Sequence, residues 1–193
     1  MPVSSLCIVT PTISRPTLAR ALRSAVLSPG DEWLVIGDGS QPEAEAQVAA
    51  LNVPGMHYVE GPETHHYGNE QRDLAMSMAR AAYFLFLDDD DIFLPGALER
   101  IRHYVDGSPV MFRMHHNGGI IWRDQMIAPG NTGGSMFCVP NVPGKFGRWG
   151  DSQAYTSDQQ FILATMKHWP TLIWSGEIIV ECNPYPNKRG ILS

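Results

Sequence analysis

The chain has 193 residues, 44% of them hydrophobic, which is enough for the core of one ordinary globular domain. Its formal net charge of -6 argues against binding to nucleic acid, because a duplex-binding protein needs a basic face for the phosphates. No apolar run approaches the ~20 residues that span a bilayer, and the amino terminus lacks a basic segment before an apolar one. We therefore expect a cytoplasmic protein without a transmembrane segment.

Strands and helices alternate through the first 105 residues. Apolar runs predict strands at 6–10, 33–40, 56–60 and 83–87, and helical periodicity predicts helices at 16–27, 42–51, 69–82 and 95–105. This order is typical of an α/β fold in which a mostly parallel central sheet is flanked by helices.

The second half of the chain is less regular. It predicts strands at 109–114, 119–122, 136–139, 171–174 and 177–182, and one helix at 157–168. We find no linker and no internal repeat, so we expect one domain that covers residues 1–193. The cysteines Cys7, Cys138 and Cys182 are far apart in apolar contexts, which favours buried free thiols in a reducing compartment.

Four consecutive aspartates, Asp88 to Asp91, follow the apolar run YFLFL. Carboxylates ~5 Å apart repel each other by roughly 1 kcal/mol per pair even in a well-solvated setting, so the cluster needs a cation. In an extended chain Asp88 and Asp90 would point to one side and Asp89 and Asp91 to the other. One side would then offer two carboxylates to a hard divalent ion and its ligand.

Ligands of doubly wound sheets bind beyond the carboxyl ends of the strands, where the strand order reverses. Three loops are predicted at this edge of the sheet. They are the turn after the first strand, the turn after the second strand, and the four aspartates after the fourth.

Four segments resemble, in the right order, the nucleotide-sugar half of GT-A-fold glycosyltransferases, most closely those of family 2. They are IVTPTISRPTLARALRSAV, EWLVIGDGS, GNEQRDLA and the aspartate-tipped strand with the helix after it. The resemblance covers residues 6–105 well and continues more loosely to about residue 182. It implies a GT-A (Rossmann-like) fold with a nucleotide-sugar-binding half at about 1–105 and an acceptor half at about 106–193.

The same resemblance implies a metal-dependent activity. A sugar would move, with inversion, from a UDP- or GDP-linked donor to a hydroxyl of a glycan, a lipid-linked or a protein acceptor. Asp88 would contact the donor ribose or share the metal, and Asp90 would coordinate Mg²⁺ or Mn²⁺ that bridges the diphosphate. Asp89 is counted with the donor-binding residues, and Asp91 would support the loop.

Further donor contacts follow from the position of each motif. Pro11, Thr12 and Arg15 match the family's first loop, which lies along the nucleoside. Asp38 would help to hold the base, although Gly37 stands where the family usually has a first acid in its DDGS turn. This departure leaves the choice of nucleotide open.

The remaining candidates face the donor phosphates and the acceptor. Arg72, in GNEQRDLA, would approach the base or the phosphates. Gly133 and Gly134 match a small-residue acceptor loop, where backbone can approach a sugar. Asp158 would be the catalytic base, although Ser157 replaces the glutamate that usually precedes it.

Two loop residues and two histidine pairs complete the candidates. Trp149, in the polar loop GKFGRWGD, is the tryptophan that we expect to stack on a sugar. Asp151, in RWGDSQ, competes with Asp158 for the role of base. The pairs at 65–66 and 115–116 lack the spacing of zinc ligands, and structural or loop roles suit them better.

Two other functions stay open. Because GDGS and SD both depart from the family pattern, the chain could bind a nucleotide sugar or carbohydrate without transferring it. A sugar nucleotidyltransferase would use a similar sheet and metal, but the basic, glycine-rich first loop that grips a triphosphate is not found in the sequence.

Overall fold

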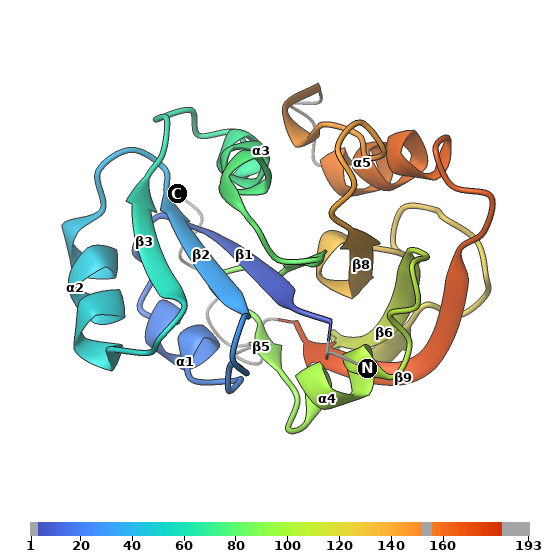
Figure 1. Cartoon of the computed structure of the whole chain (residues 1–193), viewed down its shortest axis with the longest axis horizontal. Coiled ribbons are helices and arrows are strands. Elements are labelled where there is room, and N and C mark those ends of the chain that lie inside the picture. The colour runs from blue at the N-terminus through green and yellow to red at the C-terminus, as the bar shows by residue number, and fades with distance from the viewer. Residues whose placement is uncertain (1–3, 152–155, 183–193) are drawn as a thin grey trace.

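A computed structural model describes residues 4–151 and 156–182, and Figure 1 shows how their elements are arranged. The first half runs in this order: β1 (Leu6–Thr12), α1 (Leu18–Leu22), β2 (Glu32–Gly37), α2 (Pro42–Leu51), β3 (Met56–Glu60), α3 (Asn69–Met78), β4 (Tyr83–Phe86), β5 (Ile92–Phe93), α4 (Ala97–Arg102). The second half, with η for 3-10 helices, continues with β6 (Val110–His116), β7 (Gly119–Ile121), η1 (Gly134–Met136), β8 (Phe137–Pro140), η2 (Trp149–Asp151), α5 (Ser157–Met166), β9 (Ile173–Glu181). Each described helix is too short or too polar to cross a bilayer.

One sheet runs through both halves of the chain. Its strand order is β3-β2-β1-β4-β8-β6-β9-β5, with β7 paired to β6. The strands β3, β2, β1 and β4 are parallel neighbours, and antiparallel pairs enter the sheet with β8. The predicted α/β class, with helices flanking a largely parallel sheet, is confirmed. In Figure 1, α1 and α2 lie on one side of the first three strands and α3 lies on the other. The chain moves outward from β1 to β3 and then returns to place β4 on the other side of β1. Because each of these crossovers is right-handed, the return crossover puts its helix on the opposite face.

The core is built on the central strands because helices cover both of their faces. All seven residues of β1 and all four of β4 are buried. A strand that is covered on both faces reads as a continuous apolar run, and this is why the sequence reveals these two strands so clearly. Cys7 and Cys138 are buried free thiols, as predicted, whereas the free thiol of Cys182 is only partly buried.

The first predicted helix is much shorter in the structure. The stripe from Leu18 to Val26 predicted a helix at 16–27, but α1 ends at Leu22 and the side chain of Val26 is 82% exposed. The chain leaves the helix at Arg23 and turns further on, at 28–31, where Asp31 accepts a hydrogen bond from the backbone N–H of Ser28 at 2.7 Å. The prediction for the last two turns was therefore wrong.

The two closing strands predicted at 171–174 and 177–182 form a single strand, β9. Ser175 and Gly176, which lie between the two predicted strands, continue the strand: Ser175 is buried and β9 runs on beside β6. Irregular register between Met111 and Met114 of β6 accommodates it. A bulged strand absorbs an extra residue without ending its ladder, which the alternation of side chains alone does not reveal.

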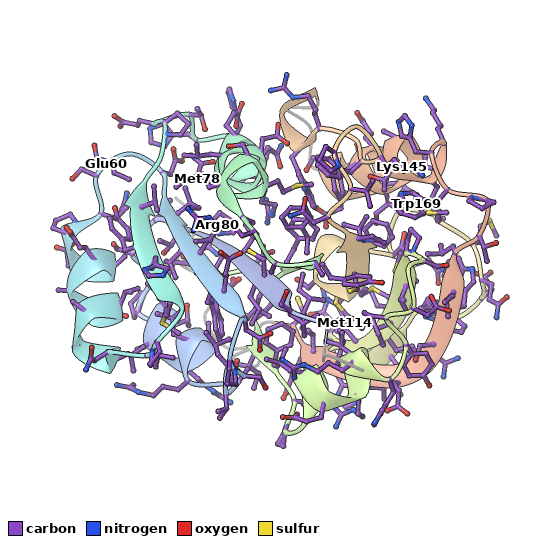
Figure 2. The ribbon with its side chains drawn as sticks, viewed as in Figure 1. Glu60, Met78, Arg80, Met114, Lys145 and Trp169 are labelled. Carbon is purple, nitrogen blue, oxygen red and sulfur yellow. The ribbon has the colours of Figure 1, made fainter. Side chains whose placement is uncertain are left out.

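Two tertiary contacts fix the remaining elements. The buried carboxylate of Asp31 accepts the backbone N–H of Leu6 at 2.9 Å and forms an ion pair with Arg102 of α4. Trp169, after α5, donates its indole N–H to the carbonyl oxygen of Lys145 at 2.7 Å, and the Lys145 ammonium lies 5.1 Å from the indole ring. Figure 2 shows these two side chains together beside α5. The loop before η2 is thus attached to the end of that helix.

Candidate active site

The site lies at the carboxyl ends of β1 and β4, where the strand order reverses. These strands are neighbours in the sheet although β2 and β3 separate them in the sequence. A cleft of about 510 Å³ opens at this edge. Its walls come from both halves of the chain, because they include the first loop, the aspartates, the glycines near 133 and the start of α5.

The four aspartates form a turn and not an extended strand end. Strand β4 ends at Phe86, and the backbone N–H of Asp91 donates to the carbonyl oxygen of Asp88 at 3.1 Å. The extended geometry assumed from the sequence is therefore wrong. The exposure of the aspartates still alternates: Asp89 and Asp91 are buried, whereas the side chains of Asp88 and Asp90 are 45% and 29% exposed.

The first loop holds the buried aspartate. The Arg15 guanidinium lies 2.9 Å from Asp89 and 3.2 Å from Asp90, and the Thr12 hydroxyl donates to Asp89 at 2.8 Å. Ser135 donates its hydroxyl to Asp91 at 3.1 Å from the other wall. Burial raises the pKa of Asp89 and of Asp90, and the positive charge of Arg15 offsets this only in part.

Helix α3 brings a second arginine to the aspartates. Arg72 donates to the carbonyl oxygen of Tyr67 at 2.8 Å and forms an ion pair with Asp88. The helix can begin this close to β1 because Gly68 precedes it with φ of 76°, and a Cβ there would lie 2.5 Å from the Cβ of Pro11. Two arginines, one from the first loop and one from α3, therefore contact the four-aspartate turn.

Asp38 is fully engaged by protein donors. Its carboxylate accepts the backbone N–H groups of Thr64 and His65, at 2.7 and 3.0 Å, and the side-chain amide of Gln71 at 2.9 Å. These bonds hold the segment between β3 and α3 against the cleft that Asp38 also lines. At Gly37, a Cβ would collide with the hydroxyl of Tyr58, which explains the glycine in GDGS.

Asp158 faces the aspartates from the opposite wall. It lies in the first turn of α5 and accepts the backbone N–H of Gly134 at 2.9 Å. Burial raises the pKa of Asp158, the charge of Asp88 raises it further, and the charge of Arg72 and the Gly134 bond lower it. A Cβ on Gly133 would lie 3.5 Å from the same carboxylate, so the small residues let this loop approach α5 closely.

Trp149 does not offer its ring to the cleft. The side chain is completely buried, with its indole stacked on Phe161 at a centroid distance of 4.3 Å and the Arg72 guanidinium 4.7 Å from its ring centroid. This burial contradicts the prediction that Trp149 stacks on a sugar. The polar residues around Trp149 in the sequence did not indicate that its ring is buried.

The predicted residues are mostly brought together. Those that line the cleft are Pro11, Thr12, Arg15, Asp38, Arg72, Asp88, Asp89, Gly133, Gly134 and Asp158. Asp90 and Trp149 are not among the lining residues. Sequence reasoning missed Ile13 and Tyr67, and it gave His116 only a structural or loop role, but all three residues line the cleft. Ile13 could have been found from its place in the first loop, whereas Tyr67 and His116 belong to no motif.

The site carries more negative than positive charge. The acids that line the cleft are Asp38, Asp88, Asp89, Asp91 and Asp158, so five acids face the two formal positive charges of Arg15 and Arg72. Among the described residues, no group of three or more His, Cys, Asp or Glu side chains is arranged to enclose a metal ion. The partly exposed carboxylates of Asp88 and Asp90 are hard oxygen donors, the kind that would suit an Mg²⁺ or Mn²⁺ ion.

A model of the family described as glycosyl transferase family 2 matches residues 7–146. The chain belongs to this family, which confirms the resemblance drawn from its motifs. Among curated protein sequences none matches the chain.

Solved structures agree on the fold. The chain is similar to S. aureus TarS 1-349, with a TM-score of 0.74 at 15% identity over 93% of this chain and 60% of that one. It is also similar to TarS 1-349 in complex with UDP-GlcNAc, with a TM-score of 0.74 at 14% identity over 92% and 58% of the two chains. These likenesses confirm the GT-A fold. The chain spans at most about 60% of the TarS chains that it matches.

Proposed function

We propose that the cleft binds a nucleoside diphosphate sugar and transfers the sugar to an acceptor hydroxyl. The observation that carries this proposal is the placement of Asp158 opposite the aspartate turn, in one cleft at the switch point of a family 2 fold. The printed description of one similar structure, a complex with UDP-GlcNAc, supports a UDP-linked donor.

The donor would lie along the first loop and the aspartate turn. Thr12 and Arg15 hold Asp89, and this leaves Asp88 accessible from the cleft. Arg72 supplies a fixed positive charge to the same space, suited to a phosphate oxygen. Pro11 would flank the nucleoside, and Asp38 would shape the base pocket through the loop it holds.

Asp158 is the proposed general base. A carboxylate whose pKa is raised takes a proton more readily at neutral pH than a fully solvated one, and its bond to the Gly134 N–H fixes its direction. It would accept the proton of the acceptor hydroxyl as the new glycosidic bond forms and the bond to the diphosphate breaks. A single displacement of this kind inverts the anomeric centre.

A divalent ion fits the acidic turn. We assign Asp88 and Asp90 as the residues that would hold Mg²⁺ or Mn²⁺ next to the donor diphosphate. When bound, such an ion stabilises the negative charge that develops on the departing nucleoside diphosphate. The chain's own arginines and the Asp158 carboxylate perform the remaining tasks of orientation and proton transfer.

A thermal-shift panel tests the proposal. UDP or GDP should raise the melting temperature appreciably only with Mn²⁺ or Mg²⁺ present, because the acidic turn repels a bare diphosphate. Equal stabilisation in EDTA would refute the metal bridge, and no stabilisation by either nucleotide would refute the donor site. Hydrolysis of UDP- and GDP-sugars without an acceptor then separates an enzyme from a binding protein that has lost transfer activity.

A further inference from the structure

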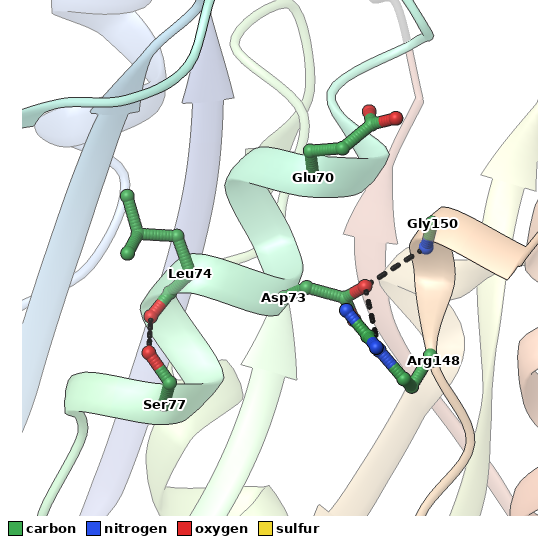
Figure 3. Close-up of a pocket in the computed structure, with 6 residues that line it drawn as sticks. All are labelled: Glu70, Asp73, Leu74, Ser77, Arg148 and Gly150. Carbon is green, nitrogen blue, oxygen red and sulfur yellow. Dashed lines mark hydrogen bonds and ion pairs between the residues drawn. The ribbon is translucent and has the colours of Figure 1, made fainter.

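Two consecutive residues of α3 hold Trp149 at two different points. The Arg72 guanidinium lies over the indole, 4.7 Å from the ring centroid. The carboxylate of Asp73 accepts the backbone N–H groups of Trp149 and Gly150, each at 2.9 Å. Figure 3 shows the Asp73 carboxylate between Gly150 and Arg148. One residue thus contacts the ring and its neighbour fixes the backbone of the same tryptophan.

The indole also contacts the elements that carry the proposed base. It stacks on Phe161 at 4.3 Å with an interplanar angle of 15°. Phe161 and Asp158 are three residues apart on α5 and therefore lie on the same side of that helix. On the loop side, a Cβ on Gly134 would come within 2.8 Å of the ring. The tryptophan therefore joins α3, α5 and the loop whose N–H binds Asp158.

The orientation of Arg72 depends on few contacts. Its two terminal nitrogens bond to Tyr67 and Asp88, and its buried Nε has no hydrogen-bond partner among the described residues. The flat ring of Trp149 is the surface against which this guanidinium rests. An arginine that rests on an aromatic face gains a cation–π attraction, which is stronger when the pair is buried.

We propose that Trp149 and Asp73 are positioning residues that hold Arg72 at the aspartate turn and align it with the helix of Asp158. The inference rests on the proposed function only in its claim that Arg72 contacts the donor diphosphate. Asp73 acts through the backbone of Trp149, and Trp149 acts through its ring face. Neither needs to touch the donor or the acceptor.

Two variants of Trp149 separate positioning from simple packing. Trp149→Phe keeps an aromatic face for Arg72, whereas Trp149→Leu keeps an apolar side chain without one. Both leave a cavity and both should lower the melting temperature. Titration calorimetry with UDP and Mn²⁺ should give a dissociation constant within about threefold of wild type for Trp149→Phe and about tenfold weaker for Trp149→Leu, the size of a buried cation–π contact. Equal weakening in the two variants overturns the inference.

Asp73 offers a second test if the leucine variant fails to fold. Asp73→Ala removes the acceptor of two backbone N–H groups and should weaken UDP about tenfold or more. Asp73→Asn retains one acceptor oxygen and should recover part of this loss. The matched control is Ser77→Ala, one turn further along α3 (Figure 3). Among the described residues the Ser77 hydroxyl bonds only to the carbonyl oxygen of Leu74, so this variant should bind UDP as wild type does. Wild-type binding by Asp73→Ala overturns the inference.

A stability measurement keeps the inference testable without a nucleotide. If the wild-type protein binds neither UDP nor GDP, the proposed function is refuted, whereas the contact between Arg72 and Trp149 can still be tested. A double-mutant cycle of Arg72→Met and Trp149→Leu, measured by urea unfolding, then shows whether the two side chains are coupled. Non-additivity of about threefold or more in the unfolding equilibrium constant supports the pair, and additivity within about 1.5-fold overturns it.

Discussion

Replacing Asp158 with asparagine removes the proposed base and keeps its shape. The amide oxygen can still accept the N–H of Gly134, which now stands 2.9 Å from the carboxylate. It cannot take a proton from an acceptor. General bases contribute about 100-fold to 10,000-fold, so transfer by Asp158→Asn should fall by about 100-fold or more, or at least about 2.7 kcal/mol in activation free energy.

The same substitution should make the fold more stable at neutral pH. The pKa of Asp158 is raised in the folded state, so the folded chain binds this proton more readily than the unfolded chain does. The contribution of this proton to the free energy of unfolding is complete below the pKa of aspartate in the unfolded chain, about 3.9. It is lost as the pH rises through the pKa of Asp158 in the folded chain. Asparagine never ionises, so the variant should melt above wild type at pH 7 to 8, and the gap should close near pH 3.

Both effects can be measured on the same samples. Transfer rates at saturating donor test the chemistry, UDP titration tests the donor site, and melting curves from pH 3 to 8 test the burial of charge. Asp151→Asn is the comparison, because Asp151 is the competing base and its side chain lies outside the described part of the chain. Near-normal turnover in Asp158→Asn would remove Asp158 from the mechanism, and loss of UDP binding would reassign it to the donor site.

Three further predictions concern the aspartate turn, the loop at Gly134 and the ion pair between Asp31 and Arg102. Asp90→Ala should abolish the Mn²⁺-dependent nucleotide shift without lowering the melting temperature of the free protein, because it relieves repulsion; a large drop would make the turn structural. Gly134→Ala should cost about 1–3 kcal/mol in urea unfolding, since its Cβ would meet the Trp149 ring, and unchanged stability would show that the ring can move. Asp31→Ala should cost about 3 kcal/mol or more, because it leaves Arg102 buried and unpaired; a loss below 1 kcal/mol contradicts this.

The sequence predicts the first half of the fold well because local and global signals coincide there. Each central strand is a continuous apolar run, and the helix at 42–51 has the predicted bounds. The meeting of Arg15 with the aspartates also follows from the sequence, since loops at the switch point of a parallel sheet must converge. This convergence explains why the predicted residues of the first loop, the second loop and the aspartate turn line one cleft.

The rest depends on contacts that local patterns do not encode. Asp31 and Arg102 are 71 residues apart, and neither has a motif that announces its partner. Trp149 lies among polar residues, yet its burial follows from Phe161 and Arg72, which approach it from two separate helices. The sequence also did not predict the pairing of Arg72 with Asp88, because the position of a residue on a helix predicts which side of the helix it lies on and not which residue it contacts.

The sheet also places its two ends at different distances from the cleft. Residue 4, the first described, lies at the amino edge of β1, opposite the cleft, whereas Cys182, the last described, belongs to the cleft wall and donates its N–H to His115 at 2.8 Å. A label attached to the Cys182 thiol would thus lie in the wall of the cleft. A label attached at Ser4, before the amino end of β1, should leave that opening free for a bulky acceptor.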